Sequence, residues 1–177
     1  MSKGEVIPYD TAMKIALRHM VAIGMMSSTE KIAIVGSLRR KESQVRDIDL
    51  QIIGRGYEVV QYFCEKDWAY ESGGDKRQIF KAPSGLYLNC FYTTIESWGA
   101  SLMHNTGSSK YNIRKRMMVK RQGGQLNQYG LYMPDEPHEG KIYDSGYLDS
   151  ACHVAGRTEK GIYDYLGWEY CKPEDRE

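Results

Sequence analysis

One segment of the chain alternates strictly between apolar and polar side chains. In residues 47–53 the apolar Ile48, Leu50 and Ile52 occupy every second position, which predicts a strand with one buried face and one polar face. A β-branched run, Lys31–Val35, precedes this segment and predicts a second strand. The two strands flank a polar turn, so the chain must build part of its core around a sheet.

Apolar spacing and turn residues predict further elements before residue 95. Apolar residues recur at helical spacing over residues 10–23, with Asp10 or Thr11 available as the N-cap. Gly73-Gly74 and the Pro83-Ser84-Gly85 turn separate short strand patterns. We therefore predict a mixed sheet with flanking helices. The remaining elements predicted here are a helix over residues 57–66 and strands over residues 68–71, 78–81 and 86–92.

Length and composition exclude several classes of protein. The 177 residues suffice for one domain, or two small lobes, with a real core. The 24 Lys and Arg nearly cancel the 23 Asp and Glu, which excludes an acidic tail-like protein and a histone-like basic one. The chain has no apolar run of the roughly 18 residues that a membrane span needs, and its start lacks a secretory signal, so we expect a soluble cytoplasmic protein. Four widely spaced cysteines without a Cys-x-x-Cys motif argue against a zinc site and a disulfide scaffold.

The second half of the chain contains a basic segment. Residues 101–128 include six basic residues and no acidic one, whereas residues 129–177 include eleven acidic and five basic residues. The nearly neutral total therefore hides a basic face. The six basic residues are Lys110, Arg114, Lys115, Arg116, Lys120 and Arg121.

This change in charge leads us to divide the chain into residues 1–100 and a second lobe, residues 101–177. Within the second lobe, residues 125–133 predict a strand or hairpin and the stretch after Pro134 predicts a loop. Residues 158–166 predict a short helix capped by Thr158.

The strongest chemical signal is Gly36-Ser37 followed by Asp47-Ile48-Asp49. Residues two apart on a strand share a face, so both carboxylates project together and need a cation between them. Carboxylates and substrate phosphates are the ligands with which phosphoryl-transfer enzymes hold magnesium. Gly36 allows a tight turn that exposes backbone N–H groups and the Ser37 hydroxyl to phosphate, and Arg40 can bind a phosphate. A solvated strand edge is the alternative, but the two motifs in this order favour a site for magnesium and a triphosphate.

These motifs resemble the signature of the nucleotidyltransferase superfamily. More narrowly, the chain resembles a family X DNA polymerase, because elements of the second lobe also match motifs of that family. The resemblance covers roughly residues 31–177 and implies an α+β fold, with a nucleotidyltransferase-type mixed-sheet palm and a small thumb lobe. The residues before Lys31 leave no room for a lyase or fingers domain, so the chain resembles the reduced viral type. The matching elements are Thr106-Gly107-Ser108, Leu126-Asn127-Gln128-Tyr129-Gly130-Leu131, Leu166-Gly167-Trp168-Glu169-Tyr170 and Pro173-Glu174-Asp175-Arg176-Glu177.

The resemblance also implies roles for individual residues. Asp47 and Asp49 would be catalytic and would ligate two magnesium ions, with manganese as the alternative metal. Asn89 occupies the position of the third metal ligand. Asn112 and Arg116, four residues apart on one helical face, would contact the nascent base pair and the template. The residues implied to bind the nucleotide are Gly36, Ser37, Arg40, His104, Asn105, Gly107 and Asn112. The residues implied to bind DNA are Lys110, Arg114, Lys115, Arg116, Lys120, Arg121, Asn127 and Tyr129.

Two positions depart from the family pattern. His104-Asn105 replaces two aromatic residues that contact the sugar, and this histidine either hydrogen-bonds the triphosphate or a ribose hydroxyl or is structural. Asn89 replaces the third carboxylate. An amide oxygen can touch a metal ion, but it brings no negative charge and cannot accept the proton of the attacking 3′-hydroxyl. We interpret Asn89 as an inactivating substitution in an otherwise intact site.

The resulting hypothesis is a monomeric DNA polymerase that adds deoxynucleotides to a primer 3′ end, in short-gap repair-type synthesis on gapped or primer–template DNA. Two alternatives stay open. The first is a nucleotidyltransferase that acts on RNA, a protein or a small molecule, because the same two motifs serve these substrates. The second is a catalytically dead DNA-binding module in which Asn89 is natural.

Overall fold

The computed structural model describes residues 6–134 and 151–177. The chain forms two compact units, Met1–Thr93 and Thr94–Glu177. The boundary that we placed after residue 100 falls inside helix α4 (Trp98–Thr106), whereas the units meet before this helix. Within the described ranges, we find no helix that is both long enough and apolar enough to span a membrane.

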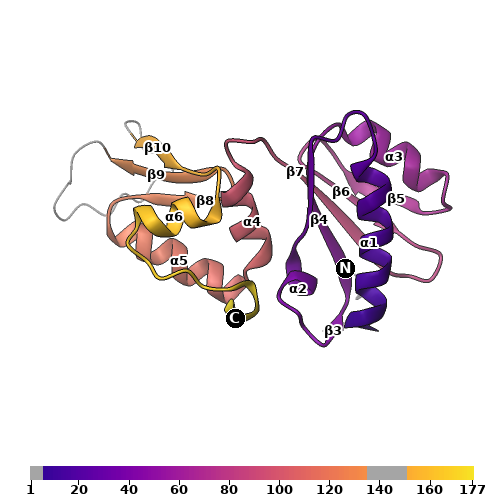
Figure 1. Cartoon of the computed structure of the whole chain (residues 1–177), viewed down its shortest axis with the longest axis horizontal. Coiled ribbons are helices and arrows are strands. Elements are labelled where there is room, and N and C mark those ends of the chain that lie inside the picture. Colours follow the sequence, from indigo (N-terminus) through magenta and orange to yellow (C-terminus); the bar gives the residue numbers. More distant parts are fainter. Residues whose placement is uncertain (1–5, 135–150) are drawn as a thin grey trace. The chain divides into compact units, whose positions relative to one another are not determined.

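The first unit is built on a five-stranded mixed sheet (Figure 1). Its strand order is β2-β4-β7-β6-β5, in which β4 and β7 are parallel and the other neighbours are antiparallel. The five predicted strands are confirmed with small shifts of their ends. A separate ribbon of β1 and β3 was not predicted. The strands are β1 (Ile7–Pro8), β2 (Lys31–Ile34), β3 (Gln44–Val45), β4 (Asp47–Ile53), β5 (Ala69–Gly73), β6 (Arg77–Lys81) and β7 (Tyr87–Tyr92).

The first and last helices of this unit lie at the predicted places, whereas the short helix that begins at Gly36 was predicted only as a tight turn. The predicted cap at Asp10 or Thr11 is wrong, because the first helix begins directly after Pro8 and has no side-chain cap. Asp10 lies instead in the first helical turn, where its negative charge interacts favourably with the helix dipole. The helices of this unit are α1 (Tyr9–Gly24), α2 (Gly36–Arg39) and α3 (Gly56–Cys64).

Alternation along the central strands separates an apolar face of the sheet from a polar one. Ile48, Leu50 and Leu88 are fully buried and join one hydrophobic core with residues of α1 and α3. Helix α3 covers this apolar face, because the Phe63 ring stacks on the Phe80 ring with 4.3 Å between the centroids. The opposite face of the sheet therefore presents the polar residues of β4.

The second unit combines helices with a three-stranded antiparallel sheet of order β10-β9-β8. Strands β8 and β9 form the predicted hairpin, and the Thr158 hydroxyl caps α6 by accepting a hydrogen bond from Gly161 N at 3.0 Å. The loop predicted after Pro134 lies outside the described residues, and α4 and β10 were not predicted. The elements that follow α4 are α5 (Ser109–Arg121), β8 (Gln125–Asn127), β9 (Gly130–Pro134), β10 (Ala151–Ala155), α6 (Glu159–Tyr165) and a 3-10 helix, Pro173–Asp175.

A buried ion pair fixes the C-terminal residues to α6. Arg176 is fully buried, and its Nη1 donates to Glu159 Oε1 at 2.5 Å. Its Nε and Nη2 donate to the carbonyl oxygen of Cys171 at 3.1 and 2.9 Å. The carbonyl oxygen of Arg176 in turn accepts a hydrogen bond from Ser108 N at 3.1 Å. Because Ser108 precedes α5, this arrangement also holds the start of that helix.

Candidate active site

Asp47, Asp49 and Asn89 lie side by side on the polar face of the first unit's sheet. The parallel pairing of β4 with β7 sets Asp49 directly opposite Asn89. Asn89 Nδ2 lies 2.8 Å from Asp49 Oδ1 and 3.5 Å from Asp47 Oδ2. The structure therefore brings together the three residues that we expected to form one metal site.

The turn after β2 approaches the carboxylate of Asp49. Gly36 has a φ of +65°, and a Cβ atom built on it would lie 2.1 Å from Asp49 Oδ2. Both its backbone conformation and the space around it therefore require glycine. Val35 N donates to the carbonyl oxygen of Asp49 at 2.9 Å, which keeps the turn next to β4. The two halves of the Gly-Ser and Asp-x-Asp pattern thus meet at one place.

Ser37 and Arg40 lie on the same turn. The Ser37 hydroxyl is buried and has no hydrogen-bond partner in the part of the chain that the structure describes. A buried hydroxyl without a partner is costly, so this one indicates a ligand that brings an acceptor or donor. Arg40 forms an ion pair with Glu42, and its charge lowers the pKa of Asp49. Phosphate oxygens can accept hydrogen bonds from both Ser37 and Arg40.

The electrostatics of the paired carboxylates favour a bound cation. Burial and the neighbouring Asp47 carboxylate raise the pKa of Asp49 to about 7, although Asn89, Arg77 and Arg40 oppose this shift. A cation between the two groups would restore the ionised form of Asp49. Within residues 6–134 and 151–177, we find no group of three or more His, Cys, Asp or Glu side chains placed to hold a metal ion. At this site Asn89 contributes an amide instead of a third carboxylate.

Arg77 belongs to this site, although it was not predicted. It lies on β6, and its Nη2 donates to Asn89 Oδ1 at 2.9 Å. An arginine side chain can only donate, so this bond orients the amide of Asn89 with its oxygen toward Arg77 and its N–H groups toward Asp47 and Asp49. Alternation along residues 77–81 was the available signal, but the register of β6 on β7 cannot be read from the sequence.

In the second unit, Gly107 and Asn112 lie where α4 ends and α5 begins. Asn112 Nδ2 donates to the carbonyl oxygens of His104 at 2.7 Å and Gly107 at 3.4 Å, and so satisfies acceptors at the end of α4. A Cβ atom at Gly107 would lie 2.7 Å from Asn112 Oδ1, so glycine permits this approach. Ser108 Oγ accepts from Tyr111 N at 3.1 Å and caps α5. Gly107 and Asn112, which we predicted to bind the nucleotide, thus form the junction between α4 and α5.

His104 and Arg116 form a second polar contact in this unit. Arg116 Nη2 lies 2.7 Å from His104 Nδ1. Burial, together with the charge of Arg116, lowers the pKa of His104 to about 4, so the neutral imidazole accepts this hydrogen bond. Asn105, by contrast, donates to Ser101 Oγ at 3.1 Å within α4. Asn112 and Arg116 of α5 therefore both bond to His104 of α4, whereas Asn105 bonds within its own helix.

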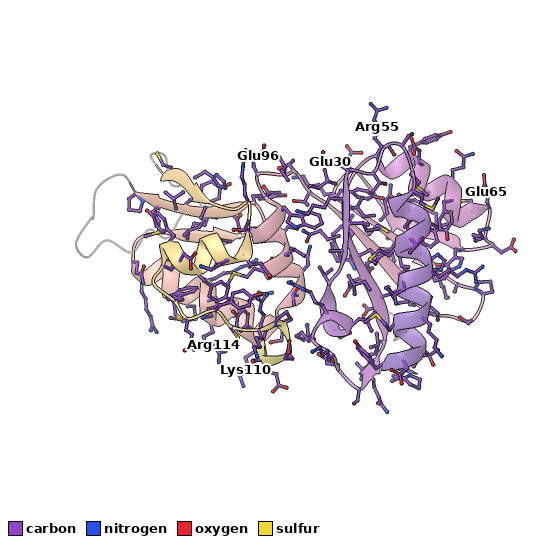
Figure 2. The ribbon with its side chains drawn as sticks, in the orientation of Figure 1. Glu30, Arg55, Glu65, Glu96, Lys110 and Arg114 are labelled. Carbon is purple, nitrogen blue, oxygen red and sulfur yellow. The ribbon has the colours of Figure 1, made fainter. Side chains whose placement is uncertain are left out.

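The cations of the basic segment differ in their surroundings. Figure 2 shows Lys110 and Arg114 reaching away from α5. Lys115 instead packs inward, with its Nζ 4.2 Å from the centroid of the Trp168 ring, and burial lowers its pKa. Its side chain therefore contributes to the packing of this unit as well as to its charge. The exposed cations of α5 are Lys110, Arg114, Lys120 and Arg121.

Asn127 and Tyr129 lie in the turn between β8 and β9. Asn127 Oδ1 accepts hydrogen bonds from Tyr129 N at 2.8 Å and Gly130 N at 3.2 Å. Asn127 thus shapes the turn, as asparagine commonly does. The side chain of Tyr129 is exposed at the tip.

Comparisons with known proteins agree with this architecture. Residues 101–177 match the family described as DNA polymerase beta thumb. The Repair DNA polymerase X of African swine fever virus, isolate Warthog/Namibia/Wart80/1980, is 29% identical over 157 residues, which cover 84% of this chain and 82% of the relative. The DNA polymerase/3′-5′ exonuclease PolX of Bacillus subtilis (strain 168) is 26% identical over 179 residues, which cover 98% of this chain and 29% of the relative.

A solved structure matches the whole architecture. The crystal structure of Leishmania infantum polymerase beta in a ternary P/T complex superposes with a TM-score of 0.76 at 20% identity, covering 98% of this chain and 77% of that one. The mixed sheet with its flanking helices, followed by the second unit, matches the polymerase beta-like fold. The matched thumb family and the viral and bacterial relatives support the resemblance to family X DNA polymerases that the motifs implied.

Proposed function

We propose that this protein extends the 3′ end of a DNA primer with deoxynucleotides under the direction of a template, in short-gap repair synthesis. The observation that carries this proposal is the convergence of Asp47 and Asp49 with the turn of Gly36 and Ser37. Paired carboxylates beside a phosphate-binding turn are what the transfer of a nucleotidyl group requires. The names of the viral relatives support a role in repair.

The residues of the site fit one divalent cation. Asp47 and Asp49 would hold it. The raised pKa of Asp49 supports a metal–triphosphate ligand here, as does the Ser37 hydroxyl, which has no hydrogen-bond partner among the described residues. When bound, such an ion neutralises charge on the triphosphate and on the departing pyrophosphate. The side chains then position the triphosphate, with Ser37 and Arg40 donating to its oxygens.

A second ion at Asn89 finds weaker support. The oxygen of the Asn89 amide accepts from Arg77, and its N–H groups point toward the carboxylates. In this orientation Asn89 offers a second ion no charge, its amide oxygen already accepts from Arg77, and it cannot take the proton of the 3′-hydroxyl. Loss of a general base alone typically lowers a rate by roughly 10²–10⁴. We therefore propose that this chain binds nucleotide and DNA but transfers nucleotides slowly.

The exposed cations of α5 are the proposed contacts to DNA phosphates. Lys110 and Arg114 reach into solvent, as do the cations at the end of the helix. Binding that rests on such contacts weakens steeply as salt is added. Asn112, Arg116 and His104 lie together beside them, which supports the proposed place of the nascent base pair in this unit.

Primer extension by the chain and by its Asn89→Asp variant tests this proposal. We expect slow or no extension with asparagine and a rate at least about 10²-fold higher with aspartate, because a base and a metal ligand are restored. Asp49→Asn in the Asn89→Asp background is the control, and it should abolish the gain. If Asn89→Asp binds DNA but gains no activity, the protein is a DNA-binding module. Activity on RNA, a protein or a small molecule without DNA binding would support the other alternative.

A further inference from the structure

The solvent side of α1 carries a line of apolar side chains. The inner side of this helix packs into the core, and Figure 1 shows α1 along the outside of the first unit. Leu17, Val21 and the C-cap residue Met25 are nevertheless 43%, 58% and 82% exposed. Residues four apart lie one above the other on a helix, so these side chains form one stripe. Half-buried methionines widen it, and we call the whole set the α1 stripe: Met13, Leu17, Met20, Val21 and Met25.

The neighbouring helix α3 has an ordinary solvated outer side. It covers the same face of the sheet, since the rings of His19 on α1 and Phe63 on α3 lie 5.1 Å apart. Its exposed positions include Gln61 and Glu65, which are joined by a hydrogen bond of 3.3 Å. Single exposed apolar side chains are common on soluble proteins, but a continuous row of them marks a surface that binds another molecule. The α1 stripe is such a row.

Positive charge borders the α1 stripe. Lys14 and Arg18 are exposed one turn apart on the same helix. Burial lowers the pKa of His19, and the charges of Arg18 and Lys66 add to this effect, so both cations lie near that ring. Within residues 6–134 and 151–177, none of these three cations forms an ion pair, and Asp10 is the one acidic residue of α1. A partner with acidic side chains beside its own apolar surface would therefore match the charge of this border.

We propose that the α1 stripe docks an amphipathic helix of a partner protein, whose own apolar stripe is bordered by Asp and Glu side chains. A helix presents apolar side chains at the same three- and four-residue spacing, so the ridges of one stripe fit the grooves of the other. Met13 and Met25 are about 18 Å apart along the helix axis, which matches a partner helix of roughly twelve to fifteen residues. Three of the five side chains are methionines, which adapt readily to an apolar partner.

The charges favour a different protein over a second copy of this chain. When two copies of one helix pack antiparallel about a twofold axis, each border of the stripe meets the same border of the other copy. Arg18 would then lie beside Arg18 of the second copy, and like charges in such positions destabilise an interface. An acidic border on the partner reverses the sign of this interaction.

Peptide probes test the proposal with the whole chain. The first probe is a fluorescein-labelled helical peptide of about 18 residues, with leucine at positions i, i+3, i+4 and i+7 and glutamate on both borders. A second peptide has lysine in place of every glutamate, and a third is a scrambled form of the first. Fluorescence anisotropy gives the dissociation constant of each peptide at low and at high salt.

Each variant has a matched control elsewhere on the surface. Val21→Gln replaces an exposed apolar side chain by a polar one that favours helix, and Tyr57→Gln is its control, because Tyr57 is 77% exposed on α3. Arg18→Gln removes a border charge, and Lys160→Gln is its control, because the Lys160 side chain is 75% exposed on α6. Urea midpoints check that all four variants stay folded.

We expect the acidic peptide to bind the parent chain more tightly than the lysine and scrambled peptides do. Val21→Gln should weaken this binding about five- to tenfold, because the partner no longer buries an apolar side chain there. Arg18→Gln should weaken it about two- to fivefold at low salt and hardly at high salt, as a charge at the rim of an interface does. The two controls should bind as the parent chain does. Equal binding of the three peptides, or no saturation up to about 1 mM, would overturn the proposal.

Two further measurements detect other occupants of the α1 stripe. If sedimentation shows that the parent chain is a dimer and Val21→Gln a monomer, a second copy covers the stripe and the proposal is wrong. It is also wrong if the parent chain sediments with vesicles of phosphatidylcholine and phosphatidylserine but does not bind the acidic peptide. A monomer that prefers the acidic peptide and does not sediment with the vesicles supports it. None of these outcomes depends on the proposed function.

Discussion

The buried ion pair of the second unit predicts a large and local loss of stability when it is broken. Arg176 is fully buried and Glu159 is 7% exposed. In Arg176→Met, the Glu159 carboxylate loses its bond at 2.5 Å and the Cys171 carbonyl loses two donors. Removing one partner of a buried pair costs about 3–5 kcal/mol, because the other charge remains without compensation. The Tyr170 hydroxyl, 3.3 Å from Glu159 Oε2, still donates to it, so we expect about 3 kcal/mol.

Hydrogen exchange resolved by mass spectrometry measures this loss where it occurs. Amides of α5 and α6 should exchange roughly 10²-fold faster in Arg176→Met, because 1.4 kcal/mol corresponds to a tenfold change. Amides of β4, in the other unit, should keep their rates and serve as an internal reference. The double variant Glu159→Gln, Arg176→Met should recover part of the protection, since no charge is then left in the buried position.

An exposed pair on the same helix is the matched control. Lys160 Nζ lies 2.5 Å from Asp164 Oδ2, but the two side chains are 75% and 57% exposed. Such a pair contributes about 0.3–0.5 kcal/mol, so Lys160→Met should change exchange by only about twofold. If Arg176→Met and Lys160→Met accelerate exchange equally, burial does not determine how much an ion pair contributes to stability, and the reasoning above is wrong.

Two further predictions concern the first unit. Gly36→Ala should abolish dATP binding in equilibrium dialysis, because the new Cβ would displace the Asp49 carboxylate. Gly167→Ala is the control: this glycine has a φ of +64° and lies in open space, so the variant has the same backbone strain and should leave dATP binding unchanged. Burial lowers the pKa of His19 from 6.5 to about 4, so the fold favours the neutral ring. The resulting stability is complete above pH 6.5 and falls as the pH drops toward 4, and His19→Gln should flatten this part of a plot of urea midpoint against pH. If the plots for the parent chain and for His19→Gln run parallel, His19 is not the group that causes this pH dependence.

Local pattern accounts for the elements of the first unit that could be predicted. Alternation of Ile48, Leu50 and Ile52 is a property of neighbouring residues, so it reveals β4 and the shared face of its two aspartates. Asn89 also falls on the predicted neighbouring strand. Arg77 was missed because its contact with Asn89 depends on how β6 pairs with β7, and pairing register is a tertiary property.

The second unit shows the same division between local and tertiary information. The cap of Thr158 on α6 was predicted, since it depends on residues close in sequence. The inward packing of Lys115 on Trp168 was not, because a run of basic residues does not reveal which of them meets an aromatic ring from a distant segment. The capping of α4 by Asn112 depends on the sharp turn between two helices, which the sequence pattern did not indicate.

The pairing of β4 with β7 has a consequence for how the protein folds. Asp49 and Asn89 are 40 positions apart in the chain, so their contact requires closure of a long loop. Contacts of this kind form slowly during folding, after helices such as α1 have had time to appear. A nascent or partly denatured chain therefore lacks the candidate active site, and recovery of the proposed nucleotide binding during refolding would report completion of the central sheet.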